Sequence, residues 1–171
     1  KDNTVVTTVM ANIGFHKAIK ENGGRTEITA VGDRYVLENM LANGYNLGGE
    51  QSGHIIFTDF STTGDGPVTA LQVLSYLKRT RHKASAITKI MTSYPQLLVN
   101  VKVATKDGWE DNEAIKASIE EGKQQLGENG RILVRPSGTE PLIRVMAEGP
   151  DQKELEEICY KIADVVKAQQ G

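Results

Sequence analysis

The sequence contains one cysteine, few aromatic residues and no long apolar run. A single thiol, that of Cys159, excludes a disulfide within the chain and favours a reducing compartment, so we expect a cytoplasmic protein. No stretch approaches the roughly 18–20 apolar residues of a membrane-spanning helix, and no amino-terminal segment has the pattern of a signal peptide. A membrane partner is therefore not expected.

An excess of one charge is also absent. The 20 lysines and arginines nearly balance the 22 aspartates and glutamates, which gives a formal net charge of −2. Proteins that bind nucleic acid through bulk electrostatics need a basic surplus, so we expect no nucleic-acid partner. The basic run at 78–83 is predicted to be the charged end of a helix, where cations suit the helix dipole. With 39% hydrophobic residues, the 171-residue chain can bury one or two globular cores.

Residues 1–83 alternate β-branched runs with amphipathic segments, which is typical of a layered α/β domain. Asn12 and Asp65 directly precede two of the amphipathic segments and are predicted to cap them. The expected strands are 4–9, 27–31 and 54–59, and the expected helices are 13–21, 34–42 and 65–80.

Residues 96–171 follow a different order and predict a small α+β domain of β-α-β-β-α order. The last helix should begin at Asp151, with Glu154 three residues later as in a capping box, and should bury Cys159. We expect a helical linker over 84–95 between the two domains. The expected strands are 96–104, 131–135 and 142–147, and the expected helices are 112–126 and the one that begins at Asp151.

The segment Gly48–Ile55 (GGEQSGHI) combines three glycines with a carboxylate, a hydroxyl and an imidazole. Glycines permit backbone conformations closed to other residues and let a ligand come close. The carboxylate of Glu50 can accept two hydrogen bonds, which suits adjacent sugar hydroxyls, and Ser52 and His54 follow within four residues. A G-x-S-x-G nucleophile elbow is excluded, because Ser52 stands fourth from Gly49 rather than third. An ordinary glycine-rich turn is the alternative that spacing leaves open.

The segment Arg135–Arg144 (RPSGTEPLIR) has an arginine at each end and prolines around Ser137, Gly138 and Thr139. Hydroxyl groups, backbone N–H groups near the glycine and guanidinium forks together predict an anion-binding nest. A phosphate there would accept several charge-assisted hydrogen bonds, worth about 1.5–3 kcal/mol each. A Walker loop is excluded because no G-x-x-x-x-G-K-[ST] motif occurs. The simpler alternative is a hairpin loop in which one arginine pairs with Glu140.

These two loops, with AVGDRYV at 30–36 and TTGDGP at 62–67, resemble the carboxyl-terminal half of the α-D-phosphohexomutase family. The residues of the loops are most similar to those of the branch that acts on glucosamine phosphates. The resemblance covers essentially the whole chain and implies a sugar-recognition domain at 1–83 and a phosphate-binding domain at 96–171. Because the first strand follows Lys1 so closely, we expect the sugar-recognition domain to be truncated at its start.

The resemblance also implies an activity. The family is an isomerase family that moves phosphate between the 6- and 1-oxygens of a hexose, through a phosphoserine enzyme and a bisphosphate intermediate. The implied partner is therefore a phosphosugar, glucosamine 6-phosphate or glucosamine 1-phosphate. The implied sugar-binding residues are Glu50, Ser52, His54, Asp33 and Arg34. The implied phosphate-binding residues are Arg135, Ser137, Gly138 and Thr139, with Arg144 in a supporting role.

The family's phosphoserine and magnesium loops do not occur in these residues. No T-x-S-H-N-like segment is present, and Gly32-Asp33-Arg34 lacks the further aspartates of a D-G-D-x-D-R loop. A lone carboxylate such as that of Asp65 is a poor magnesium cage. We therefore expect no catalytic residue and no metal ligand here, and we expect missing amino-terminal domains to supply the phosphoserine and Mg²⁺.

Two further interpretations are consistent with the sequence. The chain alone is expected to bind a phosphosugar without turning it over. A family member that acts on glucose or mannose phosphates would carry the same two loops, and so would a free-standing phosphosugar-binding module. Glucosamine differs from these sugars at carbon 2, and nothing in the sequence identifies a residue that contacts this carbon.

Overall fold

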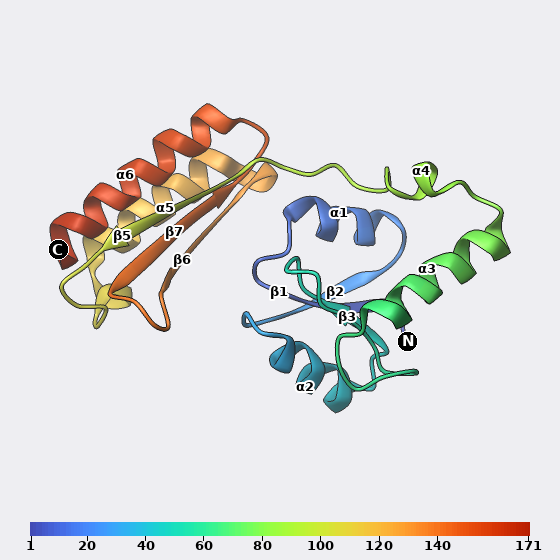
Figure 1. The fold of residues 1–171 in the computed structure, drawn as a ribbon. Coiled ribbons are helices and arrows are strands. Elements are labelled where there is room, and N and C mark those ends of the chain that lie inside the picture. The colour runs from blue at the N-terminus through green and yellow to red at the C-terminus, as the bar shows by residue number, and fades with distance from the viewer. The chain divides into compact units, whose positions relative to one another are not determined.

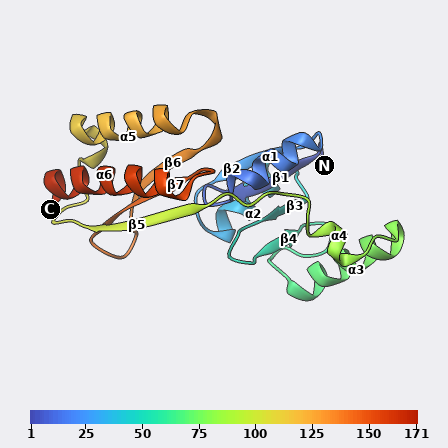
Figure 2. The ribbon, with the colours of Figure 1, turned by 90° about the horizontal axis from the view of Figure 1, so that it is seen from above.

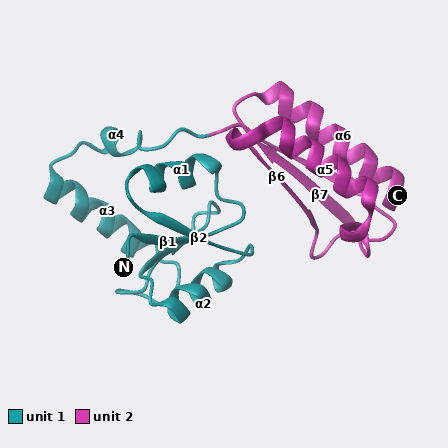
Figure 3. Ribbon diagram, turned by 180° about the vertical axis from the view of Figure 1, so that it is seen from behind, with its two compact units in different colours: residues 1–93 teal, residues 94–171 magenta.

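The computed structural model describes residues 1–171 as two compact units, residues 1–93 and residues 94–171 (Figures 1 and 3). Each unit has its own sheet and its own hydrophobic core. The fold class predicted from the sequence, a layered α/β part followed by a small α+β part, is confirmed. No helix is both long enough and apolar enough to cross a membrane.

Unit 1 is built on a four-stranded sheet in the order β2-β1-β3-β4. Strand β1 is parallel to both β2 and β3, whereas β3 and β4 form an antiparallel hairpin. Helices α1 and α2 lie on opposite sides of this sheet (Figure 1). The chain moves one way along the sheet from β1 to β2 and the other way from β2 to β3, and right-handed crossovers then place the two helices on opposite faces. The strands are β1 (Thr4–Thr8), β2 (Arg25–Thr29), β3 (Leu47–Gly49) and β4 (Ile55–Phe57). The helices are α1 (Ile13–Glu21), α2 (Asp33–Asn43), α3 (Gly66–Thr80) and α4 (Ala84–Ile87).

Strand β3 is held close to α2 by the lack of a side chain at Gly48. A Cβ atom placed there would lie 2.5 Å from Met40 Sδ and 2.7 Å from Val36 Cγ1, so any larger residue would push the helix away. Both neighbours are fully buried in the core of unit 1. The close packing of α2 on β3 brings the start of that helix towards the loop that follows β3.

Two predicted helix caps in unit 1 are confirmed. The side chain of Asn12 accepts a hydrogen bond from the Gly14 N–H at the start of α1. The carboxylate of Asp65 accepts one from the Val68 N–H at 2.8 Å at the start of α3. Each cap satisfies a backbone donor that has no partner within its helix.

Unit 2 consists of a three-stranded antiparallel sheet with two helices on one of its faces (Figure 3). Seen from above, α5 and α6 run side by side over the strands (Figure 2). The order of elements is the predicted β-α-β-β-α, and the sheet order is β5-β7-β6. The strands are β5 (Gln96–Lys102), β6 (Arg131–Pro136) and β7 (Leu142–Glu148), and the helices are α5 (Glu113–Leu126) and α6 (Gln152–Gln170).

The core of unit 2 lies between its helices and the sheet. Helix α6 presents a continuous buried face, as its spacing predicts, and Asp151 caps its first turn by accepting from the N–H groups of Lys153 and Glu154. Trp109 packs against the same core from the turn before α5. The largest contributors from the two helices are Ile115, Leu155, Ile158 and Ile162.

Two expectations about local structure are wrong, and one strand was not expected. The helical linker predicted over 84–95 contains only one turn of helix, α4, because a segment with no buried residue gains nothing to offset the cost of nucleation. Strand β3 was not expected, because two of its three residues are glycines with low β propensity; pairing with β1 and β4 determines it. Several strand ends also differ from the predictions by two residues, as for β2.

We predict that Cys159 reacts slowly in the folded chain. Burial raises the pKa of its thiol to about 11, and its Sγ donates to the Leu97 carbonyl oxygen at 3.8 Å. At pH 8 the reactive thiolate should therefore be about a hundredfold scarcer than in an unfolded chain. Alkylation with iodoacetamide, followed by mass spectrometry with and without urea, tests this. Equal rates in the two conditions would contradict the prediction.

Candidate functional site

The first candidate loop is a tight connection between β3 and β4. The Glu50 N–H donates to the His54 carbonyl oxygen at 2.9 Å, and the Gly53 N–H donates to the Glu50 carbonyl oxygen at 3.1 Å. Gly53 has a φ of 100°, a conformation that a residue with a side chain rarely adopts. The backbone of the loop is therefore closed upon itself, and its polar side chains are held at one end of the sheet.

Glu50 connects this loop to the start of α2. Its side chain is only 8% exposed, and its Oε1 accepts a hydrogen bond from the Gly32 N–H at 2.9 Å. Asp33 and Arg34 directly follow Gly32, so this hydrogen bond places their backbone next to the first loop, but no contact joins their side chains to Glu50, Ser52 or His54. Arg34 itself points along the helix, where its Nε donates to Glu38 Oε1 at 2.7 Å in a solvent-exposed pair.

Ser52 and His54 meet beside the Glu50 carboxylate. Ser52 Oγ lies 3.0 Å from His54 Nδ1 and 3.4 Å from Glu50 Oε2, and the same Nδ1 lies 3.9 Å from Glu50 Oε2. A Ser-His-acid relay needs the serine and the acid on different imidazole nitrogens. The cluster is therefore unsuited to that relay, and it suits the binding of hydroxyl groups through a carboxylate, a hydroxyl and an imidazole.

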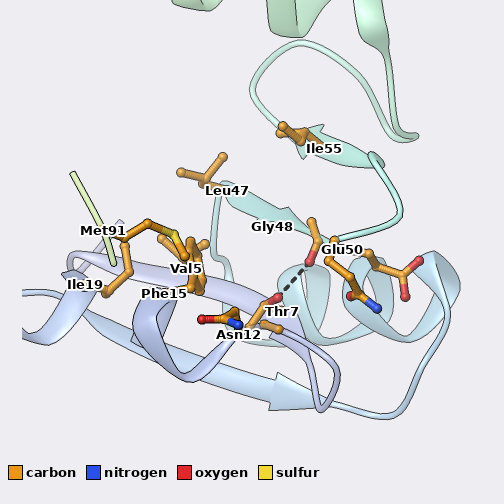
Figure 4. A pocket seen from close by; sticks show the side chains of 13 residues that line it. Val5, Thr7, Asn12, Phe15, Ile19, Leu47, Gly48, Glu50, Ile55 and Met91 are labelled. Atoms are coloured by element: carbon orange, nitrogen blue, oxygen red, sulfur yellow. Dashed lines mark hydrogen bonds between the residues drawn. The ribbon is translucent and has the colours of Figure 1, made fainter. Parts of the chain in front are cut away.

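A hollow of about 390 Å³ lies next to this loop, on the side of α1 (Figure 4). Thr7 Oγ1 donates to the Gly49 carbonyl oxygen at 3.0 Å at its rim. Most of the lining is apolar, so the hollow does not match a ligand rich in hydroxyl groups. The apolar lining includes Val5, Phe15, Ile19, Leu47, Ile55 and Met91.

The second candidate loop joins β6 to β7 and is organised by Ser137. The Ser137 N–H donates to the Leu142 carbonyl oxygen at 2.8 Å, and Ser137 Oγ accepts from the Glu140 N–H at 3.3 Å. Ser137 is only 2% exposed, whereas Gly138 and Thr139 are exposed. Ser137 thus holds the loop from beneath, and the two residues after it form the outer surface.

Gly138 is not required by the fold. A Cβ atom placed at this residue would meet no atom within 4 Å, and its φ lies outside the region that favours glycine. The absence of a side chain here leaves open space over the backbone N–H groups of the loop. A ligand that approaches this backbone closely would use that space.

Two arginines face each other at the base of the loop. Arg135 on β6 and Arg144 on β7 are directly opposed in the antiparallel ladder, so their side chains lie on the same face of the sheet. Burial and the neighbouring charge of Arg144 lower the pKa of Arg135, and no carboxylate offsets either effect. Like charges directly opposed across a strand pair are destabilising, and an anion placed between them would remove that cost.

Some N–H groups of Arg144 donate hydrogen bonds within the loop, whereas its Nε does not. Its Nη2 donates to Ser137 Oγ at 3.4 Å and to Glu140 Oε2 at 3.3 Å, which is the pairing with Glu140 that the sequence left open. Its Nε is buried and has no hydrogen-bond acceptor in the chain. A bound oxyanion would supply that acceptor.

A third cation, Lys106, lies at this loop and was not indicated by the sequence. Its Nζ donates to the Ser137 carbonyl oxygen at 2.7 Å across 31 residues of chain. Lys106 belongs to the polar turn after β5, where neither spacing nor periodicity distinguishes it from other surface lysines. Only the folded chain brings it to the loop.

Metal-binding side chains do not gather anywhere in these residues. No group of three or more histidine, cysteine, aspartate or glutamate side chains is placed to hold a metal ion. The residues described here therefore do not fit a magnesium site, and we assign them no step that passes through one.

Two family models match consecutive parts of the chain. Residues 1–94 match domain III, the alpha/beta/alpha domain of phosphoglucomutase/phosphomannomutase, and residues 98–165 match the C-terminal domain of the same family. The chain belongs to the phosphoglucomutase/phosphomannomutase family. The resemblance seen in the two loops of the sequence is thereby confirmed.

Curated relatives with high sequence identity come from one branch of this family. The chain is 57% identical over 168 residues to phosphoglucosamine mutase of Brevibacillus brevis, which covers 98% of this chain. It is 54% identical over 171 residues to phosphoglucosamine mutase of Bacillus cytotoxicus. The chain spans 38% of the length of each of these relatives.

Solved structures agree on the fold. N-acetylphosphoglucosamine mutase of Aspergillus fumigatus superimposes with a TM-score of 0.81 at 21% identity, over 98% of this chain and 38% of that one. A second structure of the Aspergillus fumigatus enzyme, in complex with GlcNAc-6P and magnesium, superimposes with a TM-score of 0.79 at 20% identity, over 98% of this chain and 39% of that one.

Replacement of Glu50 by glutamine should separate its observed contact with Gly32 from the sugar binding that the sequence predicts for it. The amide oxygen of Glu50→Gln can still accept from the Gly32 N–H, so unit 1 should keep its melting temperature within a few degrees. The lost charge should weaken binding of a polyhydroxyl ligand by roughly tenfold, because hydrogen bonds to ionised groups are about twice as strong as neutral ones. NMR titration with glucosamine 6-phosphate measures the loss, and Glu21→Gln, at an exposed glutamate at the end of α1, serves as the surface control.

Proposed function

We propose that residues 1–171 are the sugar- and phosphate-binding part of a phosphoglucosamine mutase, which interconverts glucosamine 6-phosphate and glucosamine 1-phosphate. The observation that carries this proposal is the pair Arg135–Arg144, two directly opposed guanidinium groups at the base of an exposed loop, of which only Arg144 has a carboxylate partner, Glu140. The identity of 57% to a phosphoglucosamine mutase supports this substrate over glucose or mannose phosphates.

In this proposal the second loop binds the phosphate that is not reacting. Arg135 and Arg144 supply charge-assisted hydrogen bonds, and the exposed backbone at Gly138 and Thr139 supplies N–H donors. Ser137 acts as a positioning residue, because its hydroxyl accepts from Arg144 Nη2 and the residue is buried. The binding energy obtained at this remote group orients the reacting end of the sugar.

The first loop binds the hydroxyl groups of the sugar ring. The Glu50 carboxylate accepts hydrogen bonds from adjacent hydroxyls, and Ser52 and His54 complete the contact. The reaction that we propose passes through a bisphosphate and requires the sugar to bind in two opposite orientations. A phosphate nest and a carboxylate that holds central hydroxyls serve both orientations, because each orientation presents a phosphate and a set of hydroxyls at nearly the same places.

The chemical step belongs, in this proposal, to parts of the longer protein. The curated relatives are more than twice as long as this chain. A phosphoserine would donate the phosphoryl group, and magnesium would stabilise its charge. The similar enzyme of Aspergillus fumigatus has been solved in complex with GlcNAc-6P and magnesium. We place the activity in the cytoplasm, which the free, buried Cys159 supports.

An NMR titration of the 171-residue chain with glucosamine 6-phosphate tests the proposal. We expect chemical-shift changes at residues 135–144 and at 50–54, and no conversion to the 1-phosphate. Changes confined to other residues would overturn the site, and measurable turnover would overturn the assignment of the chemical step to other domains. Glucose 6-phosphate and mannose 6-phosphate, titrated in parallel, test the choice of sugar: binding equal to that of glucosamine 6-phosphate would leave these residues without a role in selecting it.

A further inference from the structure

We propose that Lys106 is a phosphate-recognition residue that adapts the second loop to a doubly charged phosphate monoester. This inference rests on the proposed function, since it concerns the same loop. Its basis is the 2.7 Å hydrogen bond from Lys106 Nζ to the Ser137 carbonyl oxygen, which fixes an ammonium group at Ser137, the residue that precedes Gly138 and Thr139 in the loop.

The ammonium group of Lys106 is held in a fixed position. Lysine side chains on a protein surface are flexible, and ordering one costs up to about 2 kcal/mol of side-chain entropy. Lys106 is partly buried and its Nζ is bonded to a backbone oxygen, so the charge is held at one place. A lysine ammonium has three N–H donors, and this hydrogen bond uses one of them.

The second loop carries an excess of positive charge. Three cations, Lys106, Arg135 and Arg144, accompany one carboxylate, that of Glu140. The surplus is two positive charges. A phosphate monoester carries about −1.5 to −2 charges at pH 7, whereas a sulfate ester or a carboxylate carries one. With Lys106 the loop matches the dianion, and without it the loop would match a monoanion.

The two arginines alone do not match a dianion. Arg144 already pairs with Glu140, so its charge is compensated within the loop. Arg135 and Lys106 are the two cations without an ion pair, one at the base of the loop and one beside Ser137. They approach the loop from different elements, β6 and the turn after β5.

The experiment compares a dianion with a monoanion of the same shape. The 171-residue chain, Lys106→Met and Lys106→Arg are titrated by NMR with glucosamine 6-phosphate and with glucosamine 6-sulfate at pH 8, where the phosphate is fully dianionic. Because the lost charge acts twice as strongly on a dianion, Lys106→Met should lose about tenfold in affinity for the phosphate and about threefold for the sulfate. Lys106→Arg should restore both affinities to within about twofold.

The possible outcomes separate this inference from the proposed function. Equal losses for the two ligands would mean that Lys106 only supports the loop structurally, and no loss would mean that it does not act at all; either result overturns the inference. Failure of the arginine variant to restore binding also contradicts it. If the unaltered chain binds neither ligand at residues 135–144, the proposed function itself fails. Melting temperatures of both variants show whether the fold is retained.

Discussion

Replacement of Arg135 by alanine should weaken the binding of glucosamine 6-phosphate by at least about thirtyfold, equal to about 2 kcal/mol. The guanidinium of Arg135 can donate two parallel hydrogen bonds to a phosphate, and it has no carboxylate in the chain to bind instead. Isothermal calorimetry or NMR titration of the 171-residue chain measures the change.

The stability of the Arg135→Ala variant should distinguish function from structure. Arg135 faces Arg144 across the ladder, so its removal relieves a repulsion and the melting temperature should not fall. Arg135→Lys keeps the charge but loses the planar fork, and it should show an intermediate affinity. Arg79→Ala, which removes an exposed arginine from the last turn of α3, is the matched control and should bind normally. Normal affinity of Arg135→Ala would contradict the assignment of the phosphate loop.

The regular elements of both units could be predicted from the sequence because their patterns are local. The face of α6 repeats at helical spacing, and Asn12, Asp65 and Asp151 each accept a backbone hydrogen bond where a cap was expected. Strand β3 could not be predicted in this way. The strand forms through its pairing with β1 and β4, and Gly48 is needed for close packing against α2; both are contacts between segments that are separate in the sequence.

The candidate sites were predictable to the extent that their residues are neighbours in the sequence. Glu50, Ser52 and His54 lie within five residues, and the structure brings their side chains together. Two features depended on tertiary structure. The hydrogen bond from Gly32 to Glu50 joins residues 18 apart in the sequence, and the one from Lys106 to Ser137 joins residues 31 apart. No repeating sequence pattern predicts either contact.

The strand pair β6–β7 carries two charge pairs of opposite kind. At one end of its ladder Arg131 is opposed to Glu148, and four residues along β6 Arg135 is opposed to Arg144. The first pair has a carboxylate to neutralise the arginine, and the second has none on the opposed residue. We infer that the first pair stabilises unit 2, whereas the second holds positive charge for a ligand at some cost in stability.

Replacement of Arg131 by methionine should therefore destabilise unit 2 by about 3–5 kcal/mol, because it leaves a buried carboxylate without its partner. Glu148 is fully buried, its Oε2 accepts from Arg131 Nε at 2.7 Å, and its Oε1 has no partner. Urea unfolding followed by the fluorescence of Trp109, the single tryptophan, which packs against the core of unit 2, measures the loss.

Two control variants test the cause of this loss. Adding Glu148→Gln to Arg131→Met removes the buried charge and should recover most of the stability. Lys161→Met breaks the exposed pair between Lys161 and Glu121 and should cost less than about 1 kcal/mol. The N–O distance in this pair, 2.6 Å, is close to the 2.7 Å of the Arg131–Glu148 pair, so the two pairs differ mainly in burial. If Arg131→Met costs no more than Lys161→Met, burial does not control the strength of the Arg131–Glu148 pair. The division of the β6–β7 ladder into a stabilising end and a ligand-binding end would then be wrong.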